Sequence, residues 1–170
     1  MTRRVPVGRQ IAVAVALLVA VAAIAIGGSF ATAGNVDGWY ADIDKVPWHP
    51  PGWLFGPVWS VMYVLIAASG FVLWRRTAAD GRAWDPALTV YVVQLALNAA
   101  WTPIFFAGYP LIGEAAWWIA LGVILALIVS VVVLMGFDTI RSKTAGWLLA
   151  PYLIWLLFAS TLNVGVVALN

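Results

Sequence analysis

The sequence predicts an all-α integral membrane protein, a single domain over residues 1–170 in which five transmembrane helices form a bundle. Of the 170 residues, 64% are hydrophobic and 9% are charged, whereas a soluble domain carries about 45–50% apolar and about 25% charged residues. Five apolar stretches reach the length of roughly 20 residues that a membrane-spanning helix needs. They do not alternate apolar with polar residues, as the strands of a membrane barrel do.

The apolar stretches must be helical, because lipid offers no hydrogen-bond partners to the backbone N–H and C=O groups. Runs of polar and charged residues separate the stretches and mark where each helix ends. The predicted helices are 10–33, 53–74, 87–107, 116–137 and 146–168, and a first loop covers 34–52.

The first predicted helix is rich in small residues at helical spacing, which in lipid allow two helices to approach closely. These residues are Ala12, Ala16, Ala20, Ala23, Gly27 and Ala31. A competing interpretation is a signal peptide, with Arg3 and Arg4 before an apolar core and a small-residue cleavage site at 31–33. The unbroken apolar run 11–26 is slightly long for a signal peptide, so we expect the helix to be retained. A mature protein that lacks the first 33 residues would contradict the five-helix fold.

The first loop, residues 34–52, combines proline with aromatic side chains. Pro47, Pro50 and Pro51 stiffen its backbone and prevent a continuous helix, so we expect a rigid lid over one end of the bundle. The aromatic residues of this loop and of the start of the next helix include Trp39, Tyr40, Trp48, Trp53 and Trp59. Two interpretations remain open: Trp and Tyr anchor proteins at membrane interfaces, and flat aromatic walls suit a flat apolar ligand.

The later helices place polar and aromatic residues three or four positions apart, and so on one face. These faces hold Trp59 and Tyr63 in helix 53–74, Tyr91, Gln94, Asn98, Trp101 and Phe105 in helix 87–107, and Trp155, Ala159 and Asn163 in helix 146–168. Helix 116–137 carries no charge from Ile119 to Met135. Amides inside a bilayer normally face the bundle interior and hydrogen-bond between helices. The alternative is that they form the polar edge of a cavity lined by Trp59, Trp101 and Trp155.

Basic residues in the loops predict the orientation of the chain. Eight of the nine lie in the N-terminal segment and in the second and fourth loops, and these are Arg3, Arg4, Arg9, Arg75, Arg76, Arg82, Arg141 and Lys143. The other side has only Lys45, among the acidic residues Asp37, Asp42, Asp44 and Glu114. We therefore expect the N-terminus inside and the C-terminus outside.

Several kinds of chemistry lack the residues they need. The chain has no Cys, one His and seven Asp or Glu, so we expect no metal site, no covalently required cofactor and no proton relay within the membrane. We expect the lone His49 on the surface rather than as a haem or metal ligand. A net charge of +2 fits the asymmetry of the loops and predicts no nucleic-acid partner.

Three blocks of sequence resemble the translocator protein family, also known as tryptophan-rich sensory proteins or peripheral-type benzodiazepine receptors. They are WYADIDKVPWHPPGWLFGPVW at 39–59, QLALNAAWTPIFF at 94–106 and PYLIWLLFASTLN at 151–163. With matching helices between the blocks, the resemblance covers essentially the whole chain. It implies a bacterial member of a five-helix family, located in the cell membrane.

The resemblance also implies a site. Family members bind porphyrins such as protoporphyrin IX and haem, and synthetic benzodiazepine-site ligands. The implied ligand-binding residues are Trp39, Trp48, Trp59, Tyr63, Asn98, Trp101 and Trp155, and the implied lid residues are Lys45, Pro50 and Pro51. An aromatic residue at the start of helix 116–137 corresponds to Trp117 or Trp118.

The function implied by the resemblance is that of a membrane receptor or sensor, which binds a porphyrin-type small molecule and regulates tetrapyrrole metabolism or a stress response. An alternative is an enzyme that degrades porphyrins in light, with Trp59 and Trp155 as the reactive residues. A further alternative is a transporter of porphyrin or lipid, although the absence of intramembrane charge and of internal repeats argues against coupled transport. Membrane lipid is the other expected partner.

The chain departs from the family pattern at three places. Val46 follows Lys45, and the proline that the family usually has there comes one residue later. The animal cholesterol motif needs a Tyr and a basic residue, and the sequence after Leu162 has neither, so sterol recognition by that motif is not expected. Thr89 and Val93 replace a glycine pair of some members, so we expect that a homodimer does not use that close-packed surface.

Overall fold

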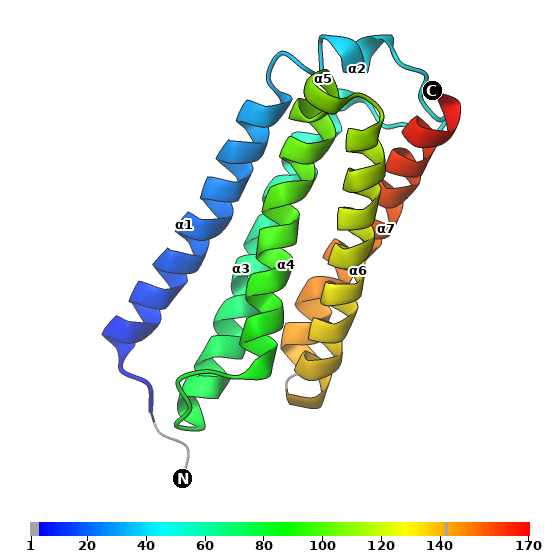
Figure 1. Cartoon of the computed structure of the whole chain (residues 1–170). Coiled ribbons are helices and arrows are strands. Elements are labelled where there is room, and N and C mark those ends of the chain that lie inside the picture. The colour runs from blue at the N-terminus through cyan, green and yellow to red at the C-terminus, as the bar shows by residue number, and fades with distance from the viewer. Residues whose placement is uncertain (1–3, 142) are drawn as a thin grey trace.

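The computed structural model describes residues 4–141 and 143–170 and confirms the predicted all-α membrane fold (Figure 1). Five of its described segments are long and apolar enough to cross a membrane. They are Val7–Thr32, Gly52–Ala79, Pro86–Ala107, Ala115–Phe137 and Thr144–Leu169. Of the basic residues used for the orientation, Arg3 and the side chains of Arg141 and Lys143 lie outside the described part.

The described residues form five long helices and four short helical elements. The long helices are α1 (Val7–Thr32), α3 (Phe55–Ala79), α4 (Pro86–Thr102), α6 (Ala115–Arg141) and α7 (Lys143–Leu169). The short elements are α2 (Trp39–Asp42), the 3-10 turn η1 (Gly52–Leu54), the π-helix η2 (Pro103–Ala107) and α5 (Tyr109–Ile112). In space the long helices form the ring α1, α3, α7, α6, α4, in which each helix contacts the next and α4 contacts α1.

Leucine and isoleucine side chains from α3, α6 and α7 fill the centre of the ring. The largest buried aliphatic residues are Ile66, Leu73, Ile124, Leu127, Leu134, Leu149 and Leu156. Helix α1 is different, because only Val21 of its residues is buried. The first helix therefore stands against one side of a compact four-helix group, as Figure 1 shows.

Most of the small residues singled out in α1 face away from the bundle, whereas Ala20 and Ala31 are half-buried. Ala12, Ala16, Ala23 and Gly27 are exposed, and a Cβ added at Gly27 would meet no atom within 4 Å. The close approach occurs one residue later, where a Cβ at Gly28 would lie 3.6 Å from the Thr102 side chain of α4. Composition shows that helices can approach closely, but the rotation of α1 decides which small residues do so.

Several helix ends differ by a few residues from those predicted, and two of the differences have a clear physical cause. The helix predicted to end at residue 74 continues to Ala79, because Thr77 in its last turn is buried and packs against the bundle while Arg75 and Arg76 remain exposed. The predicted helix 87–107 is α-helical only as far as Thr102. The α-helix ends there because Pro103 has no N–H to bond to the preceding turn. There the chain widens into η2, where the Gly108 N–H donates to the Pro103 carbonyl at 3.0 Å.

The loop after α1 crosses the end of the bundle where the C-terminus lies (Figure 1). Contacts with α7 and with Asn170, the residue after it, hold the loop there. The backbone of Asp44 exchanges two hydrogen bonds with the Asn170 side chain, at 3.0 and 3.2 Å. The Trp48 indole donates to the Thr161 hydroxyl at 3.2 Å. The Val46 side chain occupies the space that a Cβ at Gly165 would take. The loop is therefore attached to α7, and we call residues 33–54 the lid.

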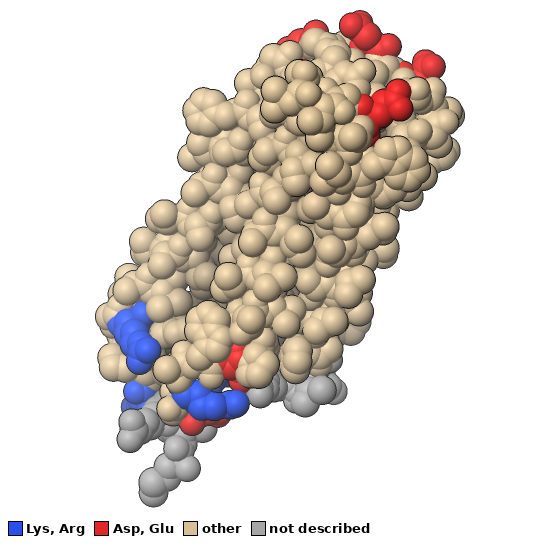
Figure 2. Space-filling model, in the orientation of Figure 1, with Lys and Arg blue, Asp and Glu red and all other residues tan. Residues whose placement is uncertain are grey.

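Charge separates along the length of the molecule. Figure 2 shows blue side chains at the N-terminal end and most of the red ones at the lid end. At the N-terminal end Arg82 pairs with Asp80 at 3.1 Å and with the buried Asp85 at 3.2 Å. The Asp85 carboxylate also accepts the Ala87 N–H at 2.9 Å and thereby caps α4.

Candidate functional site

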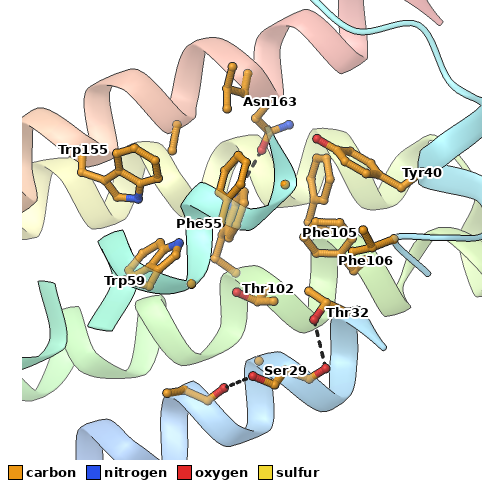
Figure 3. A pocket seen from close by; sticks show the side chains of 18 of the residues that line it. Ser29, Thr32, Tyr40, Phe55, Trp59, Thr102, Phe105, Phe106, Trp155 and Asn163 are labelled. Atoms are coloured by element: carbon orange, nitrogen blue, oxygen red, sulfur yellow. Dashed lines mark hydrogen bonds between the residues drawn. The ribbon is translucent and has the colours of Figure 1, made fainter. Parts of the chain in front are cut away.

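A cavity of about 400 Å³ lies beneath the lid, between α1, α3, α7 and the α4–η2 segment (Figure 3). Ligand sites in proteins have volumes of about 300–1,000 Å³. Trp59 and Trp155 lie toward one end of the view in Figure 3, and Tyr40 and Phe106 toward the other. Among the described residues that line the cavity, His49 is the only one with a side chain that titrates near neutral pH.

Helix α3 supplies one aromatic wall. Phe55, Trp59 and Tyr63 are four residues apart and therefore share one face of the helix. The Trp59 and Tyr63 rings lie 5.4 Å apart between centroids with 31° between their planes. Phe55 also meets Trp155 of α7 edge to face, at 5.8 Å. The wall is therefore continuous from α3 to α7.

The α4–η2 segment supplies a second wall. The rings of Trp101 and Phe105 are stacked at 5.3 Å with 20° between their planes. Trp101 is held in place from α7, because its indole donates to Asn163 Oδ1 at 3.3 Å. Asn163 is 1% exposed, and its amide donates to the Trp117 carbonyl at 3.2 Å. One buried amide therefore connects α4, α6 and α7 at the cavity.

Helix α7 contributes Trp155, Ala159 and Asn163, which are four residues apart. The Trp155 ring nitrogen is buried and has no hydrogen-bond partner among the described residues. A buried N–H without a partner is uncommon, and Trp155 lines the cavity. An acceptor atom of a bound molecule would satisfy it.

Helix α1 closes the cavity with small side chains, namely Ala25, Gly28, Ser29 and Thr32. The Ser29 hydroxyl donates to the Ala25 carbonyl and the Thr32 hydroxyl to the Ser29 carbonyl, both at 2.9 Å. Because these donors are used within α1, the wall behaves as a mostly apolar surface. It leaves room between the aromatic walls.

The lid closes the cavity with Tyr40 and His49. The Tyr40 hydroxyl and His49 Nε2 are 2.9 Å apart, and Lys45 Nζ lies 4.9 Å from the centre of the Tyr40 ring. Burial raises the pKa of Tyr40 to about 12. Burial and then the charge of Lys45 lower the pKa of His49, and a hydrogen bond with the Pro50 backbone opposes them. His49 is half-buried and lies on the cavity lining, where the sequence predicts a surface residue rather than a haem or metal ligand.

Four of the residues implied by the resemblance line the cavity together. They are Trp59, Tyr63, Trp101 and Trp155. Asn98 does not line it, because it is 4% exposed and lies behind Tyr63. Its Oδ1 accepts the Tyr63 hydroxyl at 3.2 Å, and its amide donates to the Tyr152 hydroxyl at 2.7 Å. Asn98 thus makes the interhelical hydrogen bonds that amides inside a bilayer normally make, and it does not form the polar edge of the cavity.

The two lid tryptophans that the resemblance implies, Trp39 and Trp48, also lie off the cavity. Trp39 packs behind its wall, with its centroid 6.1 Å from that of Phe105, and its indole donates to the Phe106 carbonyl at 3.2 Å. Trp48 is 56% exposed, on the outer side of α7. Lys45 Nζ donates to the Ala41 and Ile43 carbonyls, both at 3.2 Å. Lys45, Pro50 and Pro51 belong to the lid and do not line the cavity.

The two aromatic residues considered at the start of α6 have different surroundings. Trp117 is buried and stacks on Tyr109, with 4.5 Å between centroids and 2° between planes. Trp118 is 61% exposed on the outside of the helix. The position next to the site is therefore Trp117, which contacts Trp39 behind the cavity wall at 5.6 Å.

Sequence reasoning missed several cavity residues. Phe55 is four residues before Trp59, so helical spacing could have found it, as it found Phe105 and Asn163 on the faces of Trp101 and Trp155. Tyr40 and His49 lie in the aromatic loop, where no repeat indicates which rings point inward. The α1 residues carry no signal, because nothing distinguishes the inward small residues of that helix from the outward ones.

Comparison with known proteins gives one consistent result. Residues 14–169 match the model of the TspO/MBR family. The chain is 38% identical to the tryptophan-rich protein TspO of Archaeoglobus fulgidus, over 92% of this chain and 95% of that protein. It is 35% identical to the translocator protein of Bos taurus, over 78% and 75%. It is 33% identical to the tryptophan-rich sensory protein of Cereibacter sphaeroides, over 86% and 88%.

Proposed function

The chain belongs to the TspO/MBR family, and on that premise we propose that its cavity binds a flat aromatic tetrapyrrole such as protoporphyrin IX or haem. The ligand enters beneath the lid and lies between the aromatic walls of α3, α7 and the α4–η2 segment. In this proposal the protein is a receptor or sensor of tetrapyrroles in the bacterial cell membrane. It links their concentration to tetrapyrrole metabolism or to a stress response.

The observation that carries the proposal is the convergence of aromatic rings on one apolar cavity. Trp59, Trp101 and Trp155 come from three different helices, and all three line it. A flat macrocycle that contacts such rings gains the burial of each ring, and about 0.5–1.5 kcal/mol per ring pair beyond that burial. The ligand also provides acceptor atoms for the unpartnered Trp155 N–H.

The first test narrows the cavity. Ala159 is 6% exposed and lies on the lining between Trp155 and Asn163, so Ala159→Leu extends a side chain into the space of the ligand. Overpacking costs about 1–3 kcal/mol, which corresponds to a loss of affinity of roughly tenfold to a hundredfold. The loss of affinity is measured by titrating the protein with protoporphyrin IX and monitoring the quenching of tryptophan fluorescence.

The matched control for this titration is Ala168→Leu, an exposed position near the end of the same helix. It adds the same side chain outside the cavity, and we expect wild-type affinity. Saturable binding that is equal in the wild type and in both variants would place the porphyrin elsewhere. Absence of saturable binding to the wild type would contradict the proposal as a whole.

We also propose that the N-terminus faces the cell interior and that the lid faces outward. The basic residues at the end opposite the lid support this orientation (Figure 2). Because the chain has no Cys, single cysteines can report it. In intact cells, a membrane-impermeant maleimide is expected to label Asp37→Cys, and to label Asp80→Cys only after lysis. The reverse labelling pattern would show that the N-terminus faces outward and would contradict the proposed orientation.

A further inference from the structure

Tyr40 and His49 form a hydrogen-bonded pair on the lining of the cavity. The Tyr40 hydroxyl lies 2.9 Å from His49 Nε2, and both residues line the cavity. Figure 3 shows the Tyr40 ring reaching in from the lid with its hydroxyl end toward the other cavity residues. His49 is the single histidine of the chain, so no other tyrosine can form such a pair within one copy.

The direction of the hydrogen bond in this pair follows from the tautomer of His49. When Nδ1 carries the ring proton of the neutral imidazole, Nε2 is an acceptor and Tyr40 donates its O–H to it. When Nε2 carries the proton, the ring donates to the Tyr40 oxygen instead. The donor role proposed below uses the first tautomer, in which Tyr40 donates its O–H to a nitrogen base at the edge of the cavity.

The surrounding charges favour loss of the Tyr40 electron and proton together. Loss of an electron alone would leave a positive ring 4.9 Å from the Lys45 ammonium, and like charges repel. Loss of the proton alone is also unfavourable, because burial raises the pKa of Tyr40 to about 12. When both leave, the ring stays neutral and the proton already has an acceptor. Burial and Lys45 lower the pKa of His49, so its ring is neutral at neutral pH and can take the proton.

The other rings of the cavity have no comparable base. The Trp101 indole and the Tyr63 hydroxyl donate to the amide oxygens of Asn163 and Asn98, which do not accept a proton at neutral pH. The Trp155 N–H has no partner among the described residues. Of the lining rings with these described partners, Tyr40 is the one whose proton can move to a base.

We propose that Tyr40 and His49 act as a proton-coupled electron donor that quenches a photo-excited aromatic macrocycle held in the cavity. The proposal rests on the proposed function, since the excited macrocycle is the oxidant. It assigns to the lid a chemical role besides covering the ligand.

The proposed cycle consumes nothing. The excited macrocycle takes one electron from Tyr40, the Tyr40 O–H bond breaks, and an N–H bond forms at His49 Nε2. The products are a macrocycle radical anion, a neutral tyrosyl radical and an imidazolium. The electron then returns from the radical anion to the tyrosyl radical while the proton returns from Nε2. The ground states are restored and the absorbed energy is released as heat.

The test uses the full chain in lipid nanodiscs loaded with protoporphyrin IX and freed of oxygen. Flash excitation followed by transient absorption gives the decay of the excited porphyrin in H₂O and in D₂O, and electron paramagnetic resonance after illumination at low temperature detects the radical. For the wild type we expect a tyrosyl signal and slower decay in D₂O. The Tyr40→Phe variant is expected to lose the tyrosyl signal and the solvent isotope effect, and its excited porphyrin is expected to live longer. The His49→Gln variant is expected to lose the solvent isotope effect.

Tyr109→Phe is the control, because Tyr109 lies outside the cavity lining, and we expect it to keep the radical signal and the isotope effect. A dark titration separates the two proposals. If the wild type binds porphyrin in the dark but shows neither tyrosyl signal nor isotope effect, the donor role is wrong while the binding proposal stands. If the wild type does not bind, both are wrong. If the Tyr40→Phe variant does not bind porphyrin, the radical signal and isotope effect of the wild type and the isotope effect of His49→Gln still test the donor role.

Discussion

Replacing Trp59 and Trp155 together by alanine is expected to lower the affinity for protoporphyrin IX by about a hundredfold to a thousandfold. Both rings line the cavity, and they come from α3 and α7. A buried aromatic anchor commonly contributes about 2 kcal/mol or more when truncated, and about 1.4 kcal/mol corresponds to a factor of ten. The double variant Trp59→Phe and Trp155→Phe keeps a smaller aromatic ring at each position, so we expect it to lose less affinity for protoporphyrin IX than the double alanine variant.

Fluorescence titration of the purified protein measures this effect, with size-exclusion chromatography to show that each variant remains folded. Trp147→Ala is the matched control, because Trp147 is a tryptophan of α7 that is 72% exposed. It should bind porphyrin as the wild type does. If the double alanine variant is folded and binds with wild-type affinity, the aromatic walls do not hold the ligand.

Gly70→Ala is expected to destabilise the folded protein by about 1–3 kcal/mol or more, the cost of overpacking a tight contact. The Tyr91 ring of α4 packs directly against Gly70 of α3, and a Cβ at position 70 would overlap it. Tyr91 is 3% exposed, and its hydroxyl donates to the Ile66 carbonyl at 3.1 Å. The ring therefore cannot move without losing both its packing and its hydrogen bond.

Thermal unfolding in detergent compares Gly70→Ala with Gly122→Ala, where a Cβ would meet no atom within 4 Å. We expect Gly122→Ala to be neutral or slightly stabilising, because alanine favours a helix more than glycine does. Tyr91→Phe removes only the hydrogen bond and should cost about 1 kcal/mol. A Gly70→Ala variant as stable as the wild type would show that α3 and α4 do not depend on this close contact.

Much of the fold could be predicted because the bilayer imposes simple physical rules. Length and hydropathy locate five helices, since unpaired backbone groups are too costly in lipid. Helical spacing then brings Trp59 and Tyr63 onto one face and Trp155 and Ala159 onto another, and these residues do line the cavity. This part of the site depends only on the period of the helix.

The remaining part depends on how each helix is rotated and where the lid lies. Asn98 shares a face with Trp101, but it is one turn away and lies behind Tyr63. Trp39 and Trp48 look equivalent in the sequence, yet Trp39 packs behind the cavity wall and Trp48 lies outside α7. Lid position follows from long-range contacts such as Val46 with Gly165, which local patterns do not encode.

A structure of the full chain with protoporphyrin IX bound tests the central claim most directly. The account predicts the macrocycle beneath the lid, in contact with Trp59, Trp101 and Trp155, with one of its acceptor atoms within hydrogen-bond distance of the Trp155 ring nitrogen. A macrocycle found on the outer surface of the helices, with these three rings in contact only with protein or lipid, would contradict it.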